Sequence, residues 1–281
     1  MRGVRRSQEL GFKVLAGLGA SLGVLAILVL FGDVFRDGVG HFSRHFFTNY
    51  ASRFPGRAGI RAPLFGTLWL LGLTAVLSVP LSVGAAIYLE EFAPRSWVTR
   101  VVRTNIANLA GVPSIVYGIL GLALFVQALD LGRSVLAGAL TLSLLIMPII
   151  ILSAQEALRR VPRGLREAAY ALGATRWQVV RHQVLPEALP GIFSGAILAL
   201  SRAVGETAPL VLVGAVTFIA FTPEAVTDPF TALPVQIFHW VTRSQDEFRG
   251  LAAAAIVVLL ALLLSMNALA VILRNRLERR S

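Results

Sequence analysis

The chain has 281 residues, of which 56% are hydrophobic, and its mean hydropathy is +0.73. Long uncharged runs recur along it, whereas a soluble domain of this length interrupts its apolar segments with charges. The formal net charge is +11, but no soluble fold with a basic patch is visible, which argues against nucleic-acid binding. Cysteine is absent and the four histidines have no HExxH-type spacing, so we expect no disulfide and no metal site. The composition predicts an all-α polytopic protein embedded in a lipid bilayer.

The uncharged runs divide the chain, 1–281, into six predicted transmembrane helices within a single domain. About 20 apolar residues are needed to cross a bilayer as a helix. In chain order the predicted spans are 14–31, 62–89, 104–129, 134–155, 191–220 and 250–273. The first run is too long for a signal peptide and lacks a small-residue cleavage site, so we interpret it as a membrane helix. Pro80 and Pro113 are expected to kink the second and third spans, because proline removes a backbone hydrogen bond.

The distribution of Lys and Arg predicts the orientation of these spans. With the N-terminus inside, the cytoplasmic segments carry 17 of the 26 basic residues and the external segments carry 8, while Arg202 lies within a span. Cytoplasmic loops are normally the basic ones. Both termini are therefore predicted to be cytoplasmic. The aromatic residues of the external segments 33–61 and 221–249, among them Phe46 and Trp240, are expected at the membrane interface.

The fifth span carries two charges, Arg202 and Glu206, four residues apart. On a continuous helix this spacing places both on one face, where they can pair. Arg202 follows Pro190 by about 18 Å of helix, which is near the middle of a bilayer. A charge at that depth normally faces a water path or the protein interior. Two readings are open: a substrate-facing pair, with Ser201 and Thr207 as supporting donors and Pro209 freeing the carbonyl of Gly205, or a structural ion pair that locks helices together.

The cytoplasmic segment 156–190 is too polar to span and too patterned for a loose linker. Pro162 and Gly173 stand where a short helix begins and ends. Thr175 with Gln178 forms a capping-box pattern that opens a second short helix, which we expect to end at Leu185-Pro186. The segment is therefore predicted to be a helix, a glycine turn and a helix, either lying on the membrane or presented to a cytoplasmic partner.

Several motifs give this chain a resemblance to a known family. In the cytoplasmic segment, the motif residues are Glu167, Ala168, Ala169, Gly173, Ala174, Leu185 and Pro186. They resemble the EAA signature of ABC importer permeases, and the six spans suit the type I fold of that family. Two further stretches, 111–118 and 201–210, are similar to the phosphate-specific Pst permeases, and the Ala208-Pro209 pair is similar to their A-type subunits.

The resemblance implies a passive permease subunit of an ATP-driven phosphate importer in a bacterial or archaeal cytoplasmic membrane. The 162–186 segment would then dock on the ATPase, and the EAA residues would couple it to transport. Its implied partners are a second, C-type permease, an ATPase dimer and an extracytoplasmic phosphate-binding protein. This chain has no phosphate-binding GxxxxGK[ST] loop and no catalytic pair, so we expect no cofactor on it and no enzymatic activity, while its ATPase would use ATP and Mg²⁺. The alternative is a permease for another oxyanion, such as molybdate, tungstate or sulfate.

Overall fold

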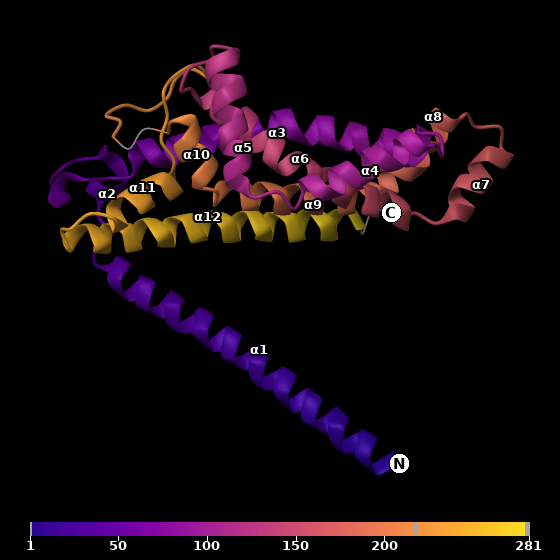
Figure 1. Ribbon diagram of the computed structural model, residues 1–281, viewed down its shortest axis with the longest axis horizontal. Coiled ribbons are helices and arrows are strands. Elements are labelled where there is room, and N and C mark those ends of the chain that lie inside the picture. The colour runs from indigo at the N-terminus through magenta and orange to yellow at the C-terminus, as the bar shows by residue number, and fades with distance from the viewer. Residues whose placement is uncertain (1, 216–217, 279–281) are drawn as a thin grey trace.

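The computed structural model describes residues 2–215 and 218–278, and the regular structure of these residues is entirely helical (Figure 1). The long helices are α1 (Arg2–Val39), α3 (Arg61–Ile87), α6 (Val135–Arg160), α9 (Leu185–Val204) and α12 (Glu247–Glu278). The shorter helices are α2 (Arg44–Thr48), α4 (Trp97–Leu109), α5 (Ser114–Gly121), α7 (Arg163–Ala171), α8 (Arg176–Val179), α10 (Ala208–Val213) and α11 (Leu233–Val241). A 3-10 turn, η1, covers Pro55–Arg57. Three π-helical turns, η2 (Tyr88–Phe92), η3 (Leu122–Ala128) and η4 (Val180–Val184), prolong α3, α5 and α8.

The membrane spans differ from the predicted ones mainly at two places. Among the described residues, five helical stretches are long and apolar enough to cross a membrane: Leu15–Val39, Arg61–Phe92, Val135–Arg160, Arg176–Val204 and Glu247–Arg276. A sixth crossing requires α4 and α5–η3, which are bent by 103° at a short break, so the bend predicted at Pro113 is present but divides 104–129 into two helices. The fifth span ends at Val204 instead of 220, and residues 216–217 of the predicted span lie outside the described residues.

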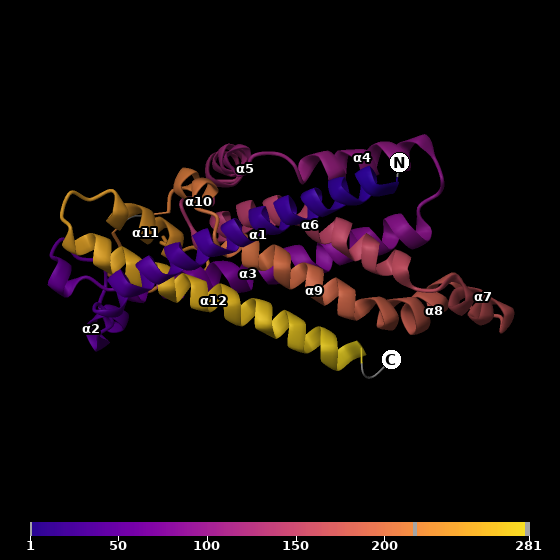
Figure 2. The same ribbon diagram turned by 90° about the horizontal axis from the view of Figure 1, so that it is seen from below.

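Helices α3, α6 and α9 form the centre of the bundle, and α6 contributes more buried side chains than either of the other two. Ile146 and Ile150 of α6 are fully buried. Several hydroxyl side chains in these helices donate to carbonyls one turn back, as Thr141 does to Ala137 at 2.8 Å, which satisfies those donors within the helix. The start of α1, the end of α12 and α7 lie toward one end of the long axis, and α2 and α11 toward the other (Figures 1 and 2).

Helix α1 leaves this bundle and packs only at its outer end, beside the start of α12 (Figure 1). A Cβ atom on Gly38 would lie 2.8 Å from the backbone nitrogen of Ala254, which shows how closely the two helices approach there. None of the window of α1 that qualifies as a membrane span is buried. Its apolar surface is therefore available to lipid or to another transmembrane subunit.

The outer end of the bundle is closed by an aromatic core. Phe46 and Trp240 are each only 1% exposed, and Trp240 packs against the buried Phe248 with 6.4 Å between ring centroids. The expectation that Phe46 and Trp240 lie at the membrane interface is therefore wrong, because α2 and α11 fold over the ends of α3 and α12. Phe238, on the other face of α11, is 54% exposed.

A loop before α11 caps the outer end of α6. The amide nitrogens of Val135 and Leu136 donate to the carbonyls of Asp228 and Val226, at 3.0 and 2.8 Å. These bonds satisfy two of the amides that the first turn of a helix leaves unpaired. The Asp228 carboxylate accepts hydrogen bonds from the backbone of Ala225 and Glu224, which lowers its pKa and stiffens the capping loop.

Candidate functional site

The helix that carries the predicted site is broken inside the membrane region. Helix α9 ends at Val204 and α10 begins at Ala208, with Pro209 in its first turn. Because proline has no amide hydrogen to donate to the Gly205 carbonyl, a flexible point is expected at Gly205. The structure has a complete interruption of the helix there. Irregular backbone at membrane depth is tolerated where it is buried in protein or lines a water-filled cavity, and half-helix ends at such places commonly bind ions.

Arg202 and Glu206 form an ion pair across this break. The Arg202 Nε and Glu206 Oε1 atoms are 3.4 Å apart, and the side chains are 53% and 16% exposed. Glu206 lies beyond the end of α9, so the two residues do not share a continuous helix face as predicted. Arg202 occupies the last turn of α9, where the helix dipole favours a cation. Because the pair uses Nε, the outer Nη1/Nη2 edge of the guanidinium remains open to a bidentate acceptor.

The packing of the neighbouring turns places Arg202 at mid-depth in the bundle. Ala199 and Ala203, on either side of it, pack in one buried cluster with Leu145 and Ile146. These two residues lie in the middle of α6, which crosses the whole bundle. The Arg202 charge therefore lies near the middle of the membrane-spanning region. An isolated charge is costly at this depth.

The two other residues predicted to support Arg202 have different surroundings. Ser201 is buried and donates to Asn267 Oδ1 of α12 at 3.0 Å, so its hydroxyl joins two helices in this structure. Thr207 lies in the break itself, immediately before α10, and its side chain makes no capping hydrogen bond. Thr207 is therefore the better placed of the two to assist a ligand beside Arg202.

The two stretches that resemble Pst permeases meet in space. Helix α5 packs along α10, and a Cβ atom on Gly118 would lie 2.7 Å from the Pro209 Cα atom. Pro113 stands at the N-cap of α5, directly after the break that separates α5 from α4. The Tyr117 hydroxyl donates to the Leu109 carbonyl across this break at 2.9 Å. Two helix interruptions thus lie on packed neighbours, whereas the third predicted kink, Pro80, lies inside a continuous α3.

The cytoplasmic segment contains one helix of its own, α7, between the fourth and fifth spans. Pro162 is its N-cap, and Gly173 follows it with a φ of +82°, a conformation that glycine adopts without strain. The reciprocal capping box of Thr175 and Gln178 then opens α8. The turn of Gly173 and Ala174 thus joins α7 to α8.

The second half of the segment differs from the prediction. Leu185-Pro186 does not end a helix, because α8, η4 and α9 run on as one apolar stretch over Arg176–Val204. Pro186 lies in the first turn of α9, directly after the π-helical turn η4. A π turn shifts the hydrogen-bonding register, which accommodates the missing proline amide. The predicted loop 156–190 is therefore shorter, since α6 also extends to Arg160.

Helix α7, which carries Glu167, Ala168 and Ala169 of the EAA signature, lies at the protruding end of the molecule (Figure 1). Glu167 and Ala168 are exposed on α7, and Leu172, at its end, is 89% exposed. Ala169 and Ala174 line a hollow of about 380 Å³ between α7 and the start of the fifth span. The exposed Leu172 also lines this hollow, and an exposed apolar side chain at a surface hollow is suited to docking a protein partner.

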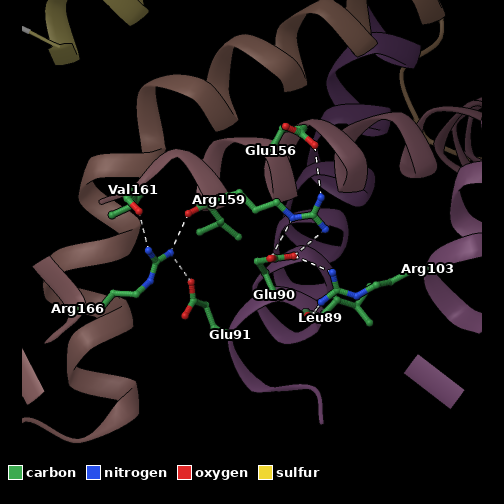
Figure 3. Close-up of polar contacts among 9 residues, drawn as sticks. Leu89, Glu90, Glu91, Arg103, Glu156, Arg159, Val161 and Arg166 are labelled. Carbon is green, nitrogen blue, oxygen red and sulfur yellow. Dashed lines mark hydrogen bonds and ion pairs between the residues drawn. The ribbon is translucent and has the colours of Figure 1, made fainter. Parts of the chain in front are cut away.

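A network of ion pairs, which no sequence pattern indicated, fixes this cytoplasmic end to the bundle (Figure 3). Glu90, in the π turn after α3, accepts from Arg159 of α6 at 3.0 and 3.1 Å and from Arg103 of α4 at 3.0 Å. Arg103 also donates to the Leu89 carbonyl. One carboxylate therefore joins the cytoplasmic ends of three helices.

The adjacent carboxylate, Glu91, holds α7. It is buried, and its Oε1 atom lies 2.9 Å from Arg166 Nη2. Arg166 also donates to the carbonyls of Val161 and Leu158 at 2.7 and 2.8 Å, where α6 ends (Figure 3). Since the last carbonyls of a helix lack internal partners, the guanidinium satisfies them and binds a carboxylate at once. Helix α7 is thus attached to α3 and α6 and cannot swing freely.

No cluster of three His, Cys, Asp or Glu side chains suited to a metal ion occurs in the described residues. The arrangement that remains is a helical bundle with a rigid cytoplasmic knob at one end and a charged helix break at mid-depth. This architecture is that of a multi-pass membrane protein with the fold of type I ABC importer permeases.

The chain belongs to the family of binding-protein-dependent transport system inner membrane components, which matches residues 78–279. It is 34% identical over 246 residues to the phosphate transport system permease protein PstA of Yersinia pestis, covering 87% of this chain and 82% of the relative. It is 45% identical over 157 residues to PstA 1 of Mycobacterium tuberculosis, covering 56% of this chain and 51%, about half, of that relative. A bacterial alginate ABC transporter, solved with a pentasaccharide-bound periplasmic protein, superposes with a TM-score of 0.64 at 17% identity, covering 96% of this chain and 94% of that one. Permeases of this family work with a second permease, an ATPase and a binding protein.

Proposed function

We propose that this chain is the permease subunit of an ATP-driven phosphate importer and forms the translocation path together with a second permease subunit. The observation that carries the proposal is the Arg202–Glu206 pair at the break between α9 and α10. The names of the two relatives, both phosphate transport system permeases, support phosphate as the substrate.

The chemistry of the pair fits a path that must release its substrate. The guanidinium of Arg202 stays charged and matches an oxyanion with two parallel N–H donors. Glu206 occupies the Nε atom and adds a negative charge nearby, so phosphate bound at the outer edge is held weakly enough to move on. Arg202 therefore favours oxyanions over neutral solutes without trapping them.

The cytoplasmic segment formed by α7 and the turn to α8 would couple transport to ATP hydrolysis. The surface of Glu167, Ala168 and Leu172 would dock on an ATPase dimer, and the carboxylates of Glu90 and Glu91 would transmit movement of α7 to α3, α4 and α6. ATP and Mg²⁺ would be used by that dimer, and this chain would catalyse no reaction. A C-type permease and an extracytoplasmic phosphate-binding protein would complete the assembly in the cytoplasmic membrane of a bacterium or an archaeon.

The test is phosphate uptake by the complete transporter in proteoliposomes. Removing one charge-assisted interaction costs roughly 1.5–3 kcal/mol, so Arg202→Ala should reduce uptake by at least about tenfold. Arg202→Lys keeps the positive charge but loses the two parallel N–H donors of the guanidinium. Its phosphate uptake should lie between the uptake of Arg202→Ala and that of the wild type. Arg53→Ala, which removes an exposed external arginine, is the matched control and should transport normally.

Normal uptake by an assembled Arg202→Ala complex would refute the role of this residue in the path. Sulfate and molybdate are supplied in parallel. If either is imported while phosphate is not, the chain is a permease for that other oxyanion.

A further inference from the structure

A polar cavity of about 510 Å³ lies near the cytoplasmic ends of α6, α9 and α12, well away from the break at Gly205. Its polar lining consists of Ser153, Glu156 and Arg160 of α6, Glu187 and Ser194 of α9, and Arg274 of α12. Arg160 ends α6, Glu187 lies in the first turn of α9, and Arg274 lies near the end of α12. The cavity is thus at the depth where the headgroups of the cytoplasmic leaflet lie.

The wall of the cavity is built by close helix packing. A Cβ atom on Gly191 would lie 2.8 Å from the Ala157 Cβ atom, so α6 and α9 touch directly beside the cavity. The Ser194 hydroxyl donates a hydrogen bond to the Pro190 carbonyl at 2.9 Å, so its oxygen can only accept a further hydrogen bond. The charged side chains are therefore the main groups with which a ligand would interact.

The charges of the lining are balanced, with two carboxylates and two guanidinium groups. They do not cancel each other across the cavity, because Arg160 and Glu187 make no ion pair with any described residue. Glu156 pairs outward with Arg159 at 3.5 Å, and this carboxylate is 62% exposed. A simple anion would be repelled by the two glutamates, and a simple cation by the two arginines.

We infer that this cavity binds the phosphoethanolamine headgroup of a membrane phospholipid. The guanidinium group of Arg160 matches its phosphate, and the carboxylate of Glu187 matches its ammonium. A primary ammonium donates hydrogen bonds to carboxylates, whereas the quaternary ammonium of choline has no N–H group. The acyl chains would lie against exposed apolar side chains of the helices that line the cavity, such as Phe193 and Leu198 of α9 and Ile272 of α12.

The inference is tested on the complete transporter by native mass spectrometry of lipids retained from nanodiscs. Wild type should retain phosphatidylethanolamine in preference to phosphatidylcholine and phosphatidylglycerol, a comparison that needs no variant. Arg160→Gln and Glu187→Gln should each lower this retention by about tenfold, the effect of one charge-assisted hydrogen bond. Arg181→Gln removes a cytoplasmic arginine that lies outside the cavity and is the matched control.

Equal retention of the three lipids by wild type would overturn the inference, and so would unchanged retention in both cavity variants. Inorganic phosphate at millimolar concentration is added in a further arm. If it displaces the lipid from wild type but not from Arg160→Gln, the cavity is a phosphate exit site instead. None of these readouts depends on Arg202, so they can fail while the proposed transport function stands.

Discussion

Gly173 is the residue at which the cytoplasmic segment reverses between α7 and α8. Its φ of +82° lies in the left-handed region, and a Cβ atom placed there would meet no other atom within 4 Å. The cost of a side chain is therefore conformational, about 1–2 kcal/mol, and does not come from a clash. Gly164, inside α7, also has open space around it but no positive φ.

Gly173→Ala should loosen the docking surface and uncouple ATP hydrolysis from transport. We expect the reconstituted complex to hydrolyse more ATP for each phosphate imported, measured by parallel ATPase and uptake assays. Gly164→Ala adds the same methyl group in a helix, where alanine is favoured over glycine, and should leave the ratio unchanged. Equal ratios in both variants would show that the turn does not contribute to coupling.

Single residues also show where sequence reasoning was sufficient. Arg202 and Glu206 could be identified because charges inside an apolar run are rare and therefore informative. The roles of Glu90 and Glu91 could not be predicted in this way, since their partners Arg159 and Arg166 lie 69 and 75 residues away. Ion pairs over such distances depend on how helices pack, and no local pattern contains that information.

Among the elements, α7 is held by one arginine. Arg166 joins α7 to the buried Glu91 and to the last carbonyls of α6. Arg163, one turn earlier, is exposed and makes no ion pair among the described residues. The two arginines carry the same charge and lie on the same helix, but only Arg166 attaches α7 to the bundle.

Arg166→Gln should increase the mobility of α7 relative to the bundle, because it leaves Glu91 buried without its partner. The chain has no cysteine, so Leu172→Cys provides a unique site for a spin label at the end of this helix. The electron paramagnetic resonance spectrum of the complete transporter should narrow in the Arg166→Gln background. The spectrum should not change in the Arg163→Gln background. Equal spectra in the two backgrounds would contradict the role of Arg166 in attaching α7 to the bundle.

The lengths of elements could be predicted better than their interruptions. Apolar runs located α1, α3, α6 and α12, although α1, α6 and α12 extend well beyond their runs. Hydropathy contains no signal for a backbone break, so 104–129 and 191–220 were each read as one helix. Pro113 and Pro209 were recognised as kinks, but whether a proline bends a helix or ends it depends on packing, as the continuous α3 around Pro80 shows.

On the scale of the whole molecule, the knob and the helix breaks are connected through rigid elements. Glu90 ties α4 to α6 at the cytoplasmic end, and α4 leads directly into the break before α5. Helix α5 in turn packs on α10, which follows the break beside Arg202. A displacement of α7 can therefore reach the charged break through packed helices, without any flexible linker between them.

Helices α5 and α10 approach each other closely where Gly118 contacts Pro209. We expect Gly118→Leu to disrupt this contact. With 2.7 Å between the added Cβ position and the Pro209 Cα atom, a leucine forces α5 and α10 apart. We expect phosphate uptake to fall by at least about tenfold, the effect of 1.4 kcal/mol, while the ATPase still copurifies because α7 is untouched. Gly72→Leu places the same side chain at an open position of α3 and should transport normally. If Gly118→Leu also transported normally, α5 and α10 would not have to stay packed for transport, and the signal from α7 would have to reach Arg202 through α6 and α9 instead.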